Sequence, residues 1–127
     1  MKANKMLTVL GLVFGLSLPA LADDEGRELY SQHCATCHQA DGGGVPFMNP
    51  PLIDSVVVQG DPETLALWVL TGNSPDDANY ESDYEGFMPG FQHVSDEDIA
   101  AILTYVRQSF GGSSSVVKSE DIKRVRN

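Results

Sequence analysis

The chain has 127 residues, of which 18 are acidic and 8 are basic, and its formal net charge at pH 7 is −10. This length allows for one ordinary domain and excludes two. The acidic excess excludes nucleic acid as a partner, because such a surface repels phosphate. It indicates either fast, salt-sensitive encounter with a basic patch on another protein or general solubility, and charge alone does not distinguish the two.

The first 22 residues have the pattern of a secretory signal peptide. Lys2 and Lys5 precede an apolar run over 6–18, and Ala20-Leu21-Ala22 forms an A-x-A cleavage site. Cleavage after Ala22 leaves 105 residues with a net charge of −12. An uncleaved anchor is the alternative, but Pro19 shortens an apolar run that would need about 20 residues to span a membrane. We therefore expect export, without stable membrane insertion of the mature chain.

Three segments predict helices, because their apolar residues recur with helical spacing. The first covers about residues 25–34, and the second runs from Pro62, after an N-cap at Asp61, to a stop at Gly72. The third is the clearest: Ser95 caps it, Asp98 lies three positions on, and Gly111-Gly112 ends it. The positions that define the three apolar faces are Gly26, Leu29, Tyr30 and His33; Leu65, Trp68 and Val69; and Ile99, Ile102, Leu103, Val106 and Phe110.

Long turn-rich stretches, over 42–51 and 73–89, separate these helices. Loops of this length are uncommon in a compact domain unless they serve a function or wrap around something. Val56-Val57-Val58 has the composition of a strand, but no partner strand appears in the sequence. The tail from Gly111 is a Gly/Ser linker followed by a short basic turn of helix that starts at Ser119. The pattern predicts an all-α fold with loops as long as its helices.

Cys34-Ala35-Thr36-Cys37-His38 matches the C-x-x-C-H motif by which a c-type haem is attached. Two thiols three positions apart at the end of a helix can each add to one vinyl group of the same porphyrin, and the tether then brings His38 to the iron. A thioredoxin-like dithiol is one alternative, but it needs an α/β pattern that the chain lacks. Zinc is another, but it needs four ligands, and His33 and His93 are poor candidates to complete a set with the motif.

The second axial ligand of the iron is expected from a distant part of the chain. Met48 follows His38 by only ten residues, and prolines at 46, 50 and 51 stiffen that path. Met88 lies between glycines and next to a proline, just before the third helix, in a loop with no other obvious purpose. The alternative role for Met88 is to fill the core, as a lone methionine usually does. The alternatives for the iron are His93 and an open or water-bound position. We expect Met88 to be the ligand, since His/Met ligation holds haem iron at a raised potential.

Four segments resemble those of a class I cytochrome c: residues 26–38, Asn49-Pro50-Pro51-Leu52, Met88-Pro89-Gly90-Phe91 and residues 95–107. The sequence is most similar to small bacterial cytochromes c, and cytochrome subunits, that serve periplasmic dehydrogenases and reductases. The resemblance implies the cytochrome c fold, with three main helices and long loops around one haem c bound covalently through Cys34 and Cys37, and a periplasmic location. Together with the pattern of the first 22 residues, it predicts a signal peptide over 1–22, a cytochrome c domain over 23–112 and a C-terminal extension with a short basic helix over 113–127.

The resemblance also implies roles for individual residues. The Pro50 carbonyl would accept a hydrogen bond from Nδ1–H of His38 and so fix the orientation of the ring. Two residues of the first helix would meet the last helix: Gly26 and Tyr30, against Tyr105. Three residues would line or neighbour the haem pocket, with ordinary core packing as the alternative for each: Leu52, Trp68 and Phe91. The acidic stretch over 74–85 matches no required part of the family pattern and is either a docking surface or a solvated loop.

A haem iron with six ligands has no open position for a substrate, so we expect electron transfer rather than catalysis. The leading hypothesis is a freely diffusing periplasmic carrier of single electrons that docks briefly on redox partner proteins near Cys34 and Cys37. The second is an electron-transfer subunit, or dedicated partner, of a periplasmic oxidoreductase such as a dehydrogenase or nitrite reductase. The third is a haem enzyme or gas sensor, which would require a labile sixth ligand.

Overall fold

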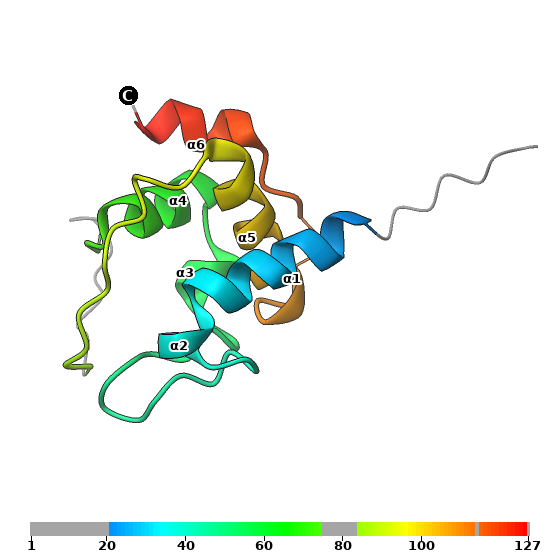
Figure 1. The fold of residues 1–127 in the computed structure, drawn as a ribbon. Helices are drawn as coiled ribbons and strands as arrows, with labels where there is room; N and C mark the ends of the chain where they lie inside the picture. The colour runs from blue at the N-terminus through cyan, green and yellow to red at the C-terminus, as the bar shows by residue number, and fades with distance from the viewer. Residues whose placement is uncertain (1–20, 75–83, 114, 127) are drawn as a thin grey trace, which may run out of the picture.

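The computed structural model describes residues 21–74, 84–113 and 115–126. In this part of the chain the regular structure is helical, apart from one isolated β-bridge between Val45 and Asn49. The helices, labelled in Figure 1, are α1 (Leu21–His33), α2 (Ala35–His38), α3 (Val56–Gln59), α4 (Pro62–Thr71), α5 (Asp96–Ser109) and α6 (Ser119–Arg126). The prediction of an all-α fold is confirmed.

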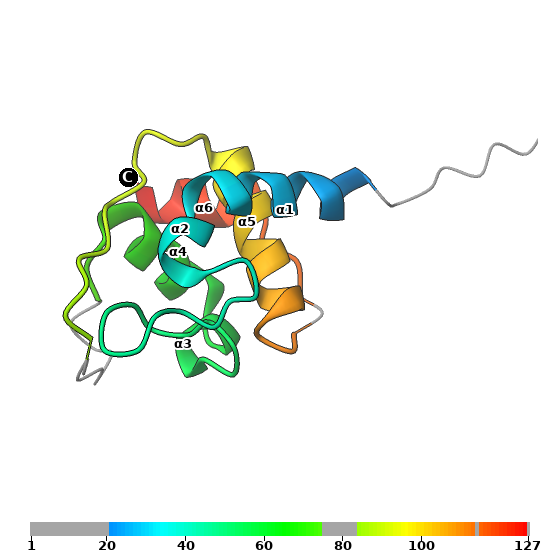
Figure 2. The same ribbon diagram turned by 60° about the horizontal axis from the view of Figure 1, so that its bottom comes forward.

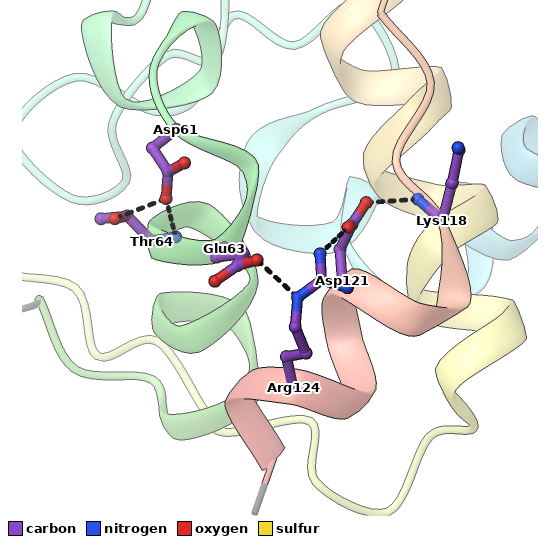
Figure 3. Close-up of polar contacts among 6 residues, drawn as sticks. All are labelled: Asp61, Glu63, Thr64, Lys118, Asp121 and Arg124. Carbon is purple, nitrogen blue, oxygen red and sulfur yellow. Dashed lines mark hydrogen bonds and ion pairs between the residues drawn. The ribbon is translucent and has the colours of Figure 1, made fainter.

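The three predicted helices are present, and two of them begin at the predicted caps. The Asp61 carboxylate accepts a hydrogen bond of 2.8 Å from the Thr64 N–H at the start of α4 (Figure 3), and Gly72 ends this helix with φ of 75°. At the start of α5, the Ser95 hydroxyl accepts a hydrogen bond of 3.1 Å from the Asp98 N–H. α1 begins four residues earlier than predicted and ends one residue earlier.

Two short helices, α2 and α3, are absent from the sequence-based prediction. The Val56–Gln59 segment, which has the composition of a strand, forms one helical turn that Ser55 caps by accepting a hydrogen bond from the Val58 N–H. A four-residue helix is too short to show an apolar period, and β-branched residues fit a single turn when tertiary packing holds it. In α3 that packing is the burial of Val58 between α1 and α5.

α5 is the central helix, and its apolar residues belong to two clusters on different sides. One cluster joins α5 to α4, α6 and the residues before α5; the other joins it to α1 and α3. The first cluster consists of Leu65, Ala66, Leu70, Phe91, Val94, Ile99, Ala100, Leu103, Val117 and Ile122; the second consists of Tyr30, Val58, Ile102 and Val106. The helical spacing read from the sequence therefore identifies the buried face of α5 correctly.

α1 crosses α5 at close range, as the resemblance implied. A Cβ atom added to Gly26 would lie 2.5 Å from the Ala101 carbonyl oxygen and 2.9 Å from Tyr105 Cβ, so glycine allows the two helices to touch. One turn further along α1, the Tyr30 ring lies 5.4 Å from the rings of both Tyr105 and Phe110. This aromatic group fixes the end of α1 that leads into the cysteine motif.

α6 confirms the predicted basic helix of the tail and packs against both α4 and α5 (Figure 1). Its Ile122 side chain is completely buried. The approach to α6 is fixed by Thr104 of α5, whose hydroxyl donates to the Val117 carbonyl and accepts from the Val117 N–H. The tail is thus part of the fold rather than an appendage.

Residues 84–94 form a strap along the side of the molecule, from the 45–49 loop to the start of α5 (Figures 1 and 2). At its beginning, the Glu85 N–H donates to the Phe47 carbonyl at 2.9 Å. In its middle it lies directly on the end of α4, where the Phe91 N–H donates to the Val69 carbonyl at 3.1 Å. The strap comes so close to Gly72 that a Cβ there would strike the Met88 carbonyl oxygen. Glycine at the end of α4 is therefore required twice, for its positive φ and for this approach.

The predicted signal peptide over 1–22 and the acidic stretch over 74–85 fall mainly outside the described residues. Among the helices of the described residues, none combines the length and apolar character that crossing a bilayer requires. The domain boundaries read from the sequence stay predictions.

Gly26→Ala tests whether the close crossing matters. Alanine is the better helix former by about 1 kcal/mol, but the added Cβ would overpack against the backbone of α5. We expect the free energy of unfolding to fall by about 1–3 kcal/mol, measured by urea denaturation followed by circular dichroism. Ser31→Ala, at an exposed position of the same helix, is the control and should change stability by less than about 0.5 kcal/mol. A Gly26→Ala protein as stable as the unmodified one would contradict the steric explanation.

Candidate functional site

The end of α1 and the single turn of α2 fix the backbone of the cysteine motif. The Cys34 N–H continues the hydrogen bonding of α1 by donating to the Tyr30 carbonyl at 2.8 Å, and the N–H groups of Cys37 and His38 both donate to the Cys34 carbonyl. Residues three and four positions apart on a helix are neighbours on its surface. Both thiols and the imidazole therefore point to the same region of space.

α2 stops after one turn because Gln39 adopts φ of 65°, an unusual value for a residue with a side chain. The Tyr30 hydroxyl donates a hydrogen bond of 2.6 Å to the Gln39 carbonyl and holds the chain there. Burial raises the pKa of the Tyr30 hydroxyl, with smaller contributions from Cys34 and Tyr105. The hydroxyl therefore keeps its proton and remains a donor at any physiological pH.

The His38 ring is oriented by the chain that follows it. Its Nδ1 lies 3.0 Å from the Pro50 carbonyl oxygen. A carbonyl only accepts, so Nδ1 must carry the hydrogen and the other ring nitrogen, Nε2, keeps its lone pair. Burial lowers the pKa of the His38 imidazole, although the bond to Pro50 opposes this shift. A neutral imidazole with a free Nε2 and a fixed Nδ1–H is the form in which histidine binds metals.

The Pro50 carbonyl reaches His38 because the intervening loop turns back on itself. The Gly44 N–H donates to the His38 carbonyl at 2.9 Å, and the Val45 N–H donates to the Asn49 carbonyl at 2.9 Å. Gly44 has φ of 67°, and a Cβ on it would lie 2.7 Å from the Pro50 oxygen and would strike the Asn49 oxygen. The loop can bring the Pro50 carbonyl to the imidazole only with glycine at position 44.

Two adjoining pockets form one cleft beside the motif. They have volumes of about 860 and 690 Å³, including the parts open to solvent. Their common walls show that they adjoin, since five side chains line both: Cys34, His38, Pro50, Trp68 and Met88. The larger pocket adds Cys37 and Phe91, and the smaller adds Leu52. All eight residues expected at the cofactor site therefore line the same cleft.

The two methionines considered as ligands of the iron, Met88 and Met48, lie in different surroundings. Met88 is half-buried, lines both pockets and packs against the core cluster around α4 and α5. Met48 is 47% exposed and lines neither pocket. Of the alternatives to Met88, His93 is exposed and likewise lines neither pocket.

The Cys34 thiol differs from the reactive thiol of a redox dithiol. Cys34 and Cys37 are both free and half-buried. Burial raises the pKa of the Cys34 thiol to about 12, and the neighbouring Cys37 adds to this. A redox-active C-x-x-C pair instead has a lowered thiol pKa. In the described part of the chain there is also no group of three or more His, Cys, Asp or Glu side chains that could hold a metal ion.

Sequence reasoning missed the contribution of α3 to the cleft. Val57 and Val58 line the smaller pocket, together with Ser55. The signal was present in the sequence, since Ser55 is an N-cap residue and Gly60 follows one helical turn later. Tyr84 and Phe87 of the strap, also not predicted, line the larger pocket.

A haem fits the chemistry of this cleft. Apolar and aromatic side chains form most of the walls of the cleft, as they do in cofactor sites. Two free thiols stand at one side, and beside them is an imidazole with an available nitrogen. Cys34 and Cys37 would hold the porphyrin covalently, and His38 would bind the iron.

Comparison with known proteins gives consistent matches. The profile of the family described as Cytochrome c matches residues 24–110. Cytochrome c-552 of Thermus thermophilus is 34% identical over 116 residues, covering 84% of this chain and 78% of the relative. The cytochrome c subunit of the quinone alcohol dehydrogenase of Gluconobacter oxydans is 36% identical over 104 residues, and the fructose dehydrogenase cytochrome subunit of Gluconobacter japonicus is 34% identical over 106. Each match covers 80% of this chain, but the chain spans only 22% of the length of either dehydrogenase subunit.

Two adjacent glycines test the link between the loop and the imidazole. Gly44→Ala should displace the Pro50 carbonyl and lower the free energy of unfolding by about 1–3 kcal/mol, because alanine is strained at this φ and overlaps the 49–50 backbone. With haem attached, the reduction potential should rise, because an imidazole that loses its hydrogen-bond acceptor donates less electron density to the iron. Electrochemistry and urea denaturation measure the two effects.

Gly43→Ala is the matched control, since Gly43 has no positive φ and its nearest neighbour would be the Asp41 carboxylate at 3.1 Å. It should leave both quantities nearly unchanged. An unchanged potential in a folded Gly44→Ala protein would show that the Pro50 carbonyl does not tune His38.

Proposed function

The chain belongs to the cytochrome c family and functions in electron transfer with a covalently bound haem c, and on this basis we propose that His38 and Met88 are the two axial ligands of its iron. When bound, the haem supplies an iron that takes up and releases one electron at a time. The observation that carries the proposal is that His38 and Met88, fifty residues apart in sequence, line the same two pockets.

The chain contributes to this function by binding and tuning rather than by reacting. The Pro50 carbonyl holds the His38 ring by its Nδ1–H, which keeps the imidazole in one tautomer and strengthens it as a donor. The absence of a side chain at Gly72 lets the strap that carries Met88 lie directly against the end of α4. Apolar walls, including Leu52, Trp68 and Phe91, would keep water away from a bound iron, and a dry site favours the less charged, reduced form of such a centre.

We propose a freely diffusing carrier, exported to the periplasm, that is not itself an enzyme. Support comes from the similarity to a cytochrome c-552 over most of that protein's length. The alternative, an electron-transfer subunit or dedicated partner of a periplasmic oxidoreductase, is supported by similarity to cytochrome subunits of alcohol and fructose dehydrogenases. Purification from the native host at low salt discriminates the two, since a carrier elutes alone and a subunit elutes with a larger protein.

We propose that redox partners dock beside the cleft on an apolar rim formed by Phe87 and Phe47. The Phe87 side chain lines the larger pocket, yet it is 84% exposed. Phe47 is also exposed, and the hydrogen bond from the Glu85 N–H to its carbonyl brings it next to this part of the strap. Exposed aromatic residues near a functional cleft are typical of transient interfaces. The chain as a whole is strongly acidic, so the partner should present a basic surface.

Met88→Ala tests the axial ligation. We expect the variant to lose the absorption of the thioether–iron bond, to have a lower reduction potential, and to bind carbon monoxide when reduced, because the iron loses a ligand that favours the reduced state. Met48→Ala is the control and should behave as the unmodified protein in all three measurements. Retention of the original potential in Met88→Ala would refute the assignment. Carbon monoxide binding to the unmodified reduced protein would instead favour a sensor or enzyme with a labile ligand.

The charge of the partner is tested by salt dependence. The bimolecular rate of electron exchange with a basic redox protein should fall by about tenfold between roughly 10 and 200 mM salt, because screening removes the attraction between the two surfaces. Stopped-flow absorbance measures this rate. Phe47→Ser should lower the rate at every salt concentration without changing the slope, since it removes apolar contact but no charge. A rate that is independent of salt would indicate that the acidic excess serves solubility alone.

A further inference from the structure

The far end of the strap is held by a residue of the C-terminal helix. Arg126 of α6 reaches three groups that follow Met88 in the chain. Its guanidinium donates three hydrogen bonds: one of 2.7 Å to the Gln92 carbonyl, one of 2.8 Å to the Val94 carbonyl and one of 2.7 Å to the Asp96 carboxylate. One side chain thus ties together the end of the strap and the first residue of α5.

These contacts are stronger than those of an ordinary surface arginine. The guanidinium is a planar fork, and here it meets two backbone carbonyls and a carboxylate together, a geometry that lysine cannot reproduce. The side chains of Arg126 and Asp96 are only 26% and 24% exposed, so solvent screens the ion pair less than at an open surface. α6 in turn is anchored by the fully buried Ile122, which gives the arginine a rigid base.

The strap is therefore fixed on both sides of Met88. Before Met88, the N–H groups of Glu85 and Gly86 donate to the carbonyls of the 47–48 segment. After Met88, the Phe91 N–H donates to Val69, and Arg126 holds the carbonyls of residues 92 and 94. The backbone that carries Met88 can move away from the cleft only if one of these attachments gives way.

We propose that Arg126 is a positioning residue for Met88: by holding the end of the strap, it sets how readily the thioether leaves the iron. This inference rests on the proposed His38/Met88 ligation. It assigns to α6, which lies beyond the residues 24–110 that match the family profile, a role in controlling the haem site and not only in stability.

The same helix offers a matched control. Arg124 also forms ion pairs, with Glu63 at the start of α4 and with Asp121 of α6 (Figure 3). These contacts lie at the opposite end of α4 from Gly72 and the strap, and the Arg124 side chain is 55% exposed. Removing Arg124 loosens α6 without releasing the carbonyls of residues 92 and 94.

The experiment measures imidazole binding to the oxidised holoprotein by absorbance titration. Added imidazole can bind the iron only when the thioether has left, so its apparent affinity is proportional to the fraction of molecules in the open state. Arg126→Gln should bind imidazole about tenfold more tightly than the unmodified protein, the change expected from losing a charge-assisted hydrogen bond. Arg126→Lys should give a rise of about threefold, because it keeps the charge near Asp96 but not the fork. Arg124→Gln should stay within about twofold.

Three outcomes would overturn the proposal. The first is an imidazole affinity of Arg126→Gln within about twofold of the unmodified protein. The second is an equal rise in Arg124→Gln, which would show that any loosening of α6 has the same effect. If Arg126→Gln does not fold, as judged by circular dichroism, Arg126→Lys decides the test, and an unchanged affinity in that variant is the third. Absence of the thioether absorption in the unmodified protein would overturn the Met88 ligation as well, which distinguishes that failure from failure of the Arg126 proposal alone.

Discussion

The crossing of α1 over α5 positions the two sides of the cleft relative to each other. α1 ends one residue before Cys34, and α5 begins two residues after the strap that carries Met88. Where the two helices touch, at Gly26, no side chain separates them, and the Tyr30 ring locks the contact against Tyr105. A change in this crossing would move the thiols and imidazole relative to the thioether, although none of the contacting residues is a ligand.

The sequence predicts those parts of the fold that local interactions determine. α4 and α5 begin at side-chain caps and are long enough to show an apolar period, so their positions follow from neighbouring residues. The position of α3 does not follow from neighbouring residues, because a single turn rich in valine is helical only when α1 and α5 bury Val58. At the site, the motif 34–38 is a local signal, and the Pro50 contact comes from resemblance. That Met88 shares the cleft with His38 depends on long-range packing that no local pattern contains.

The C-terminal helix, α6, is predicted from the sequence, but its tertiary contacts are not. Its composition is polar and basic, and the sequence alone indicates only a short turn of helix. Yet Ile122 and Val117 are buried against α4 and α5, and Arg126 binds backbone carbonyls more than thirty residues earlier in the chain. Backbone carbonyls are present at every residue, so an arginine that binds them leaves no sequence signal in its partner. The roles of such residues become visible only in the folded chain.

The walls of the cleft also belong to the hydrophobic core, which couples folding to the cofactor. Leu65, Ile102 and Leu103 are buried in the core clusters and at the same time line the smaller pocket. Covering their cleft-facing surface with an apolar porphyrin therefore adds to the same burial that holds α4 and α5 together. A covalently tethered haem stays on the chain when it unfolds, so it stabilises the fold through the apolar surface that it buries in the cleft on folding, and this contribution does not depend on haem concentration. A chain of this size, with loops as long as its helices, thus obtains part of its core from the group that it carries.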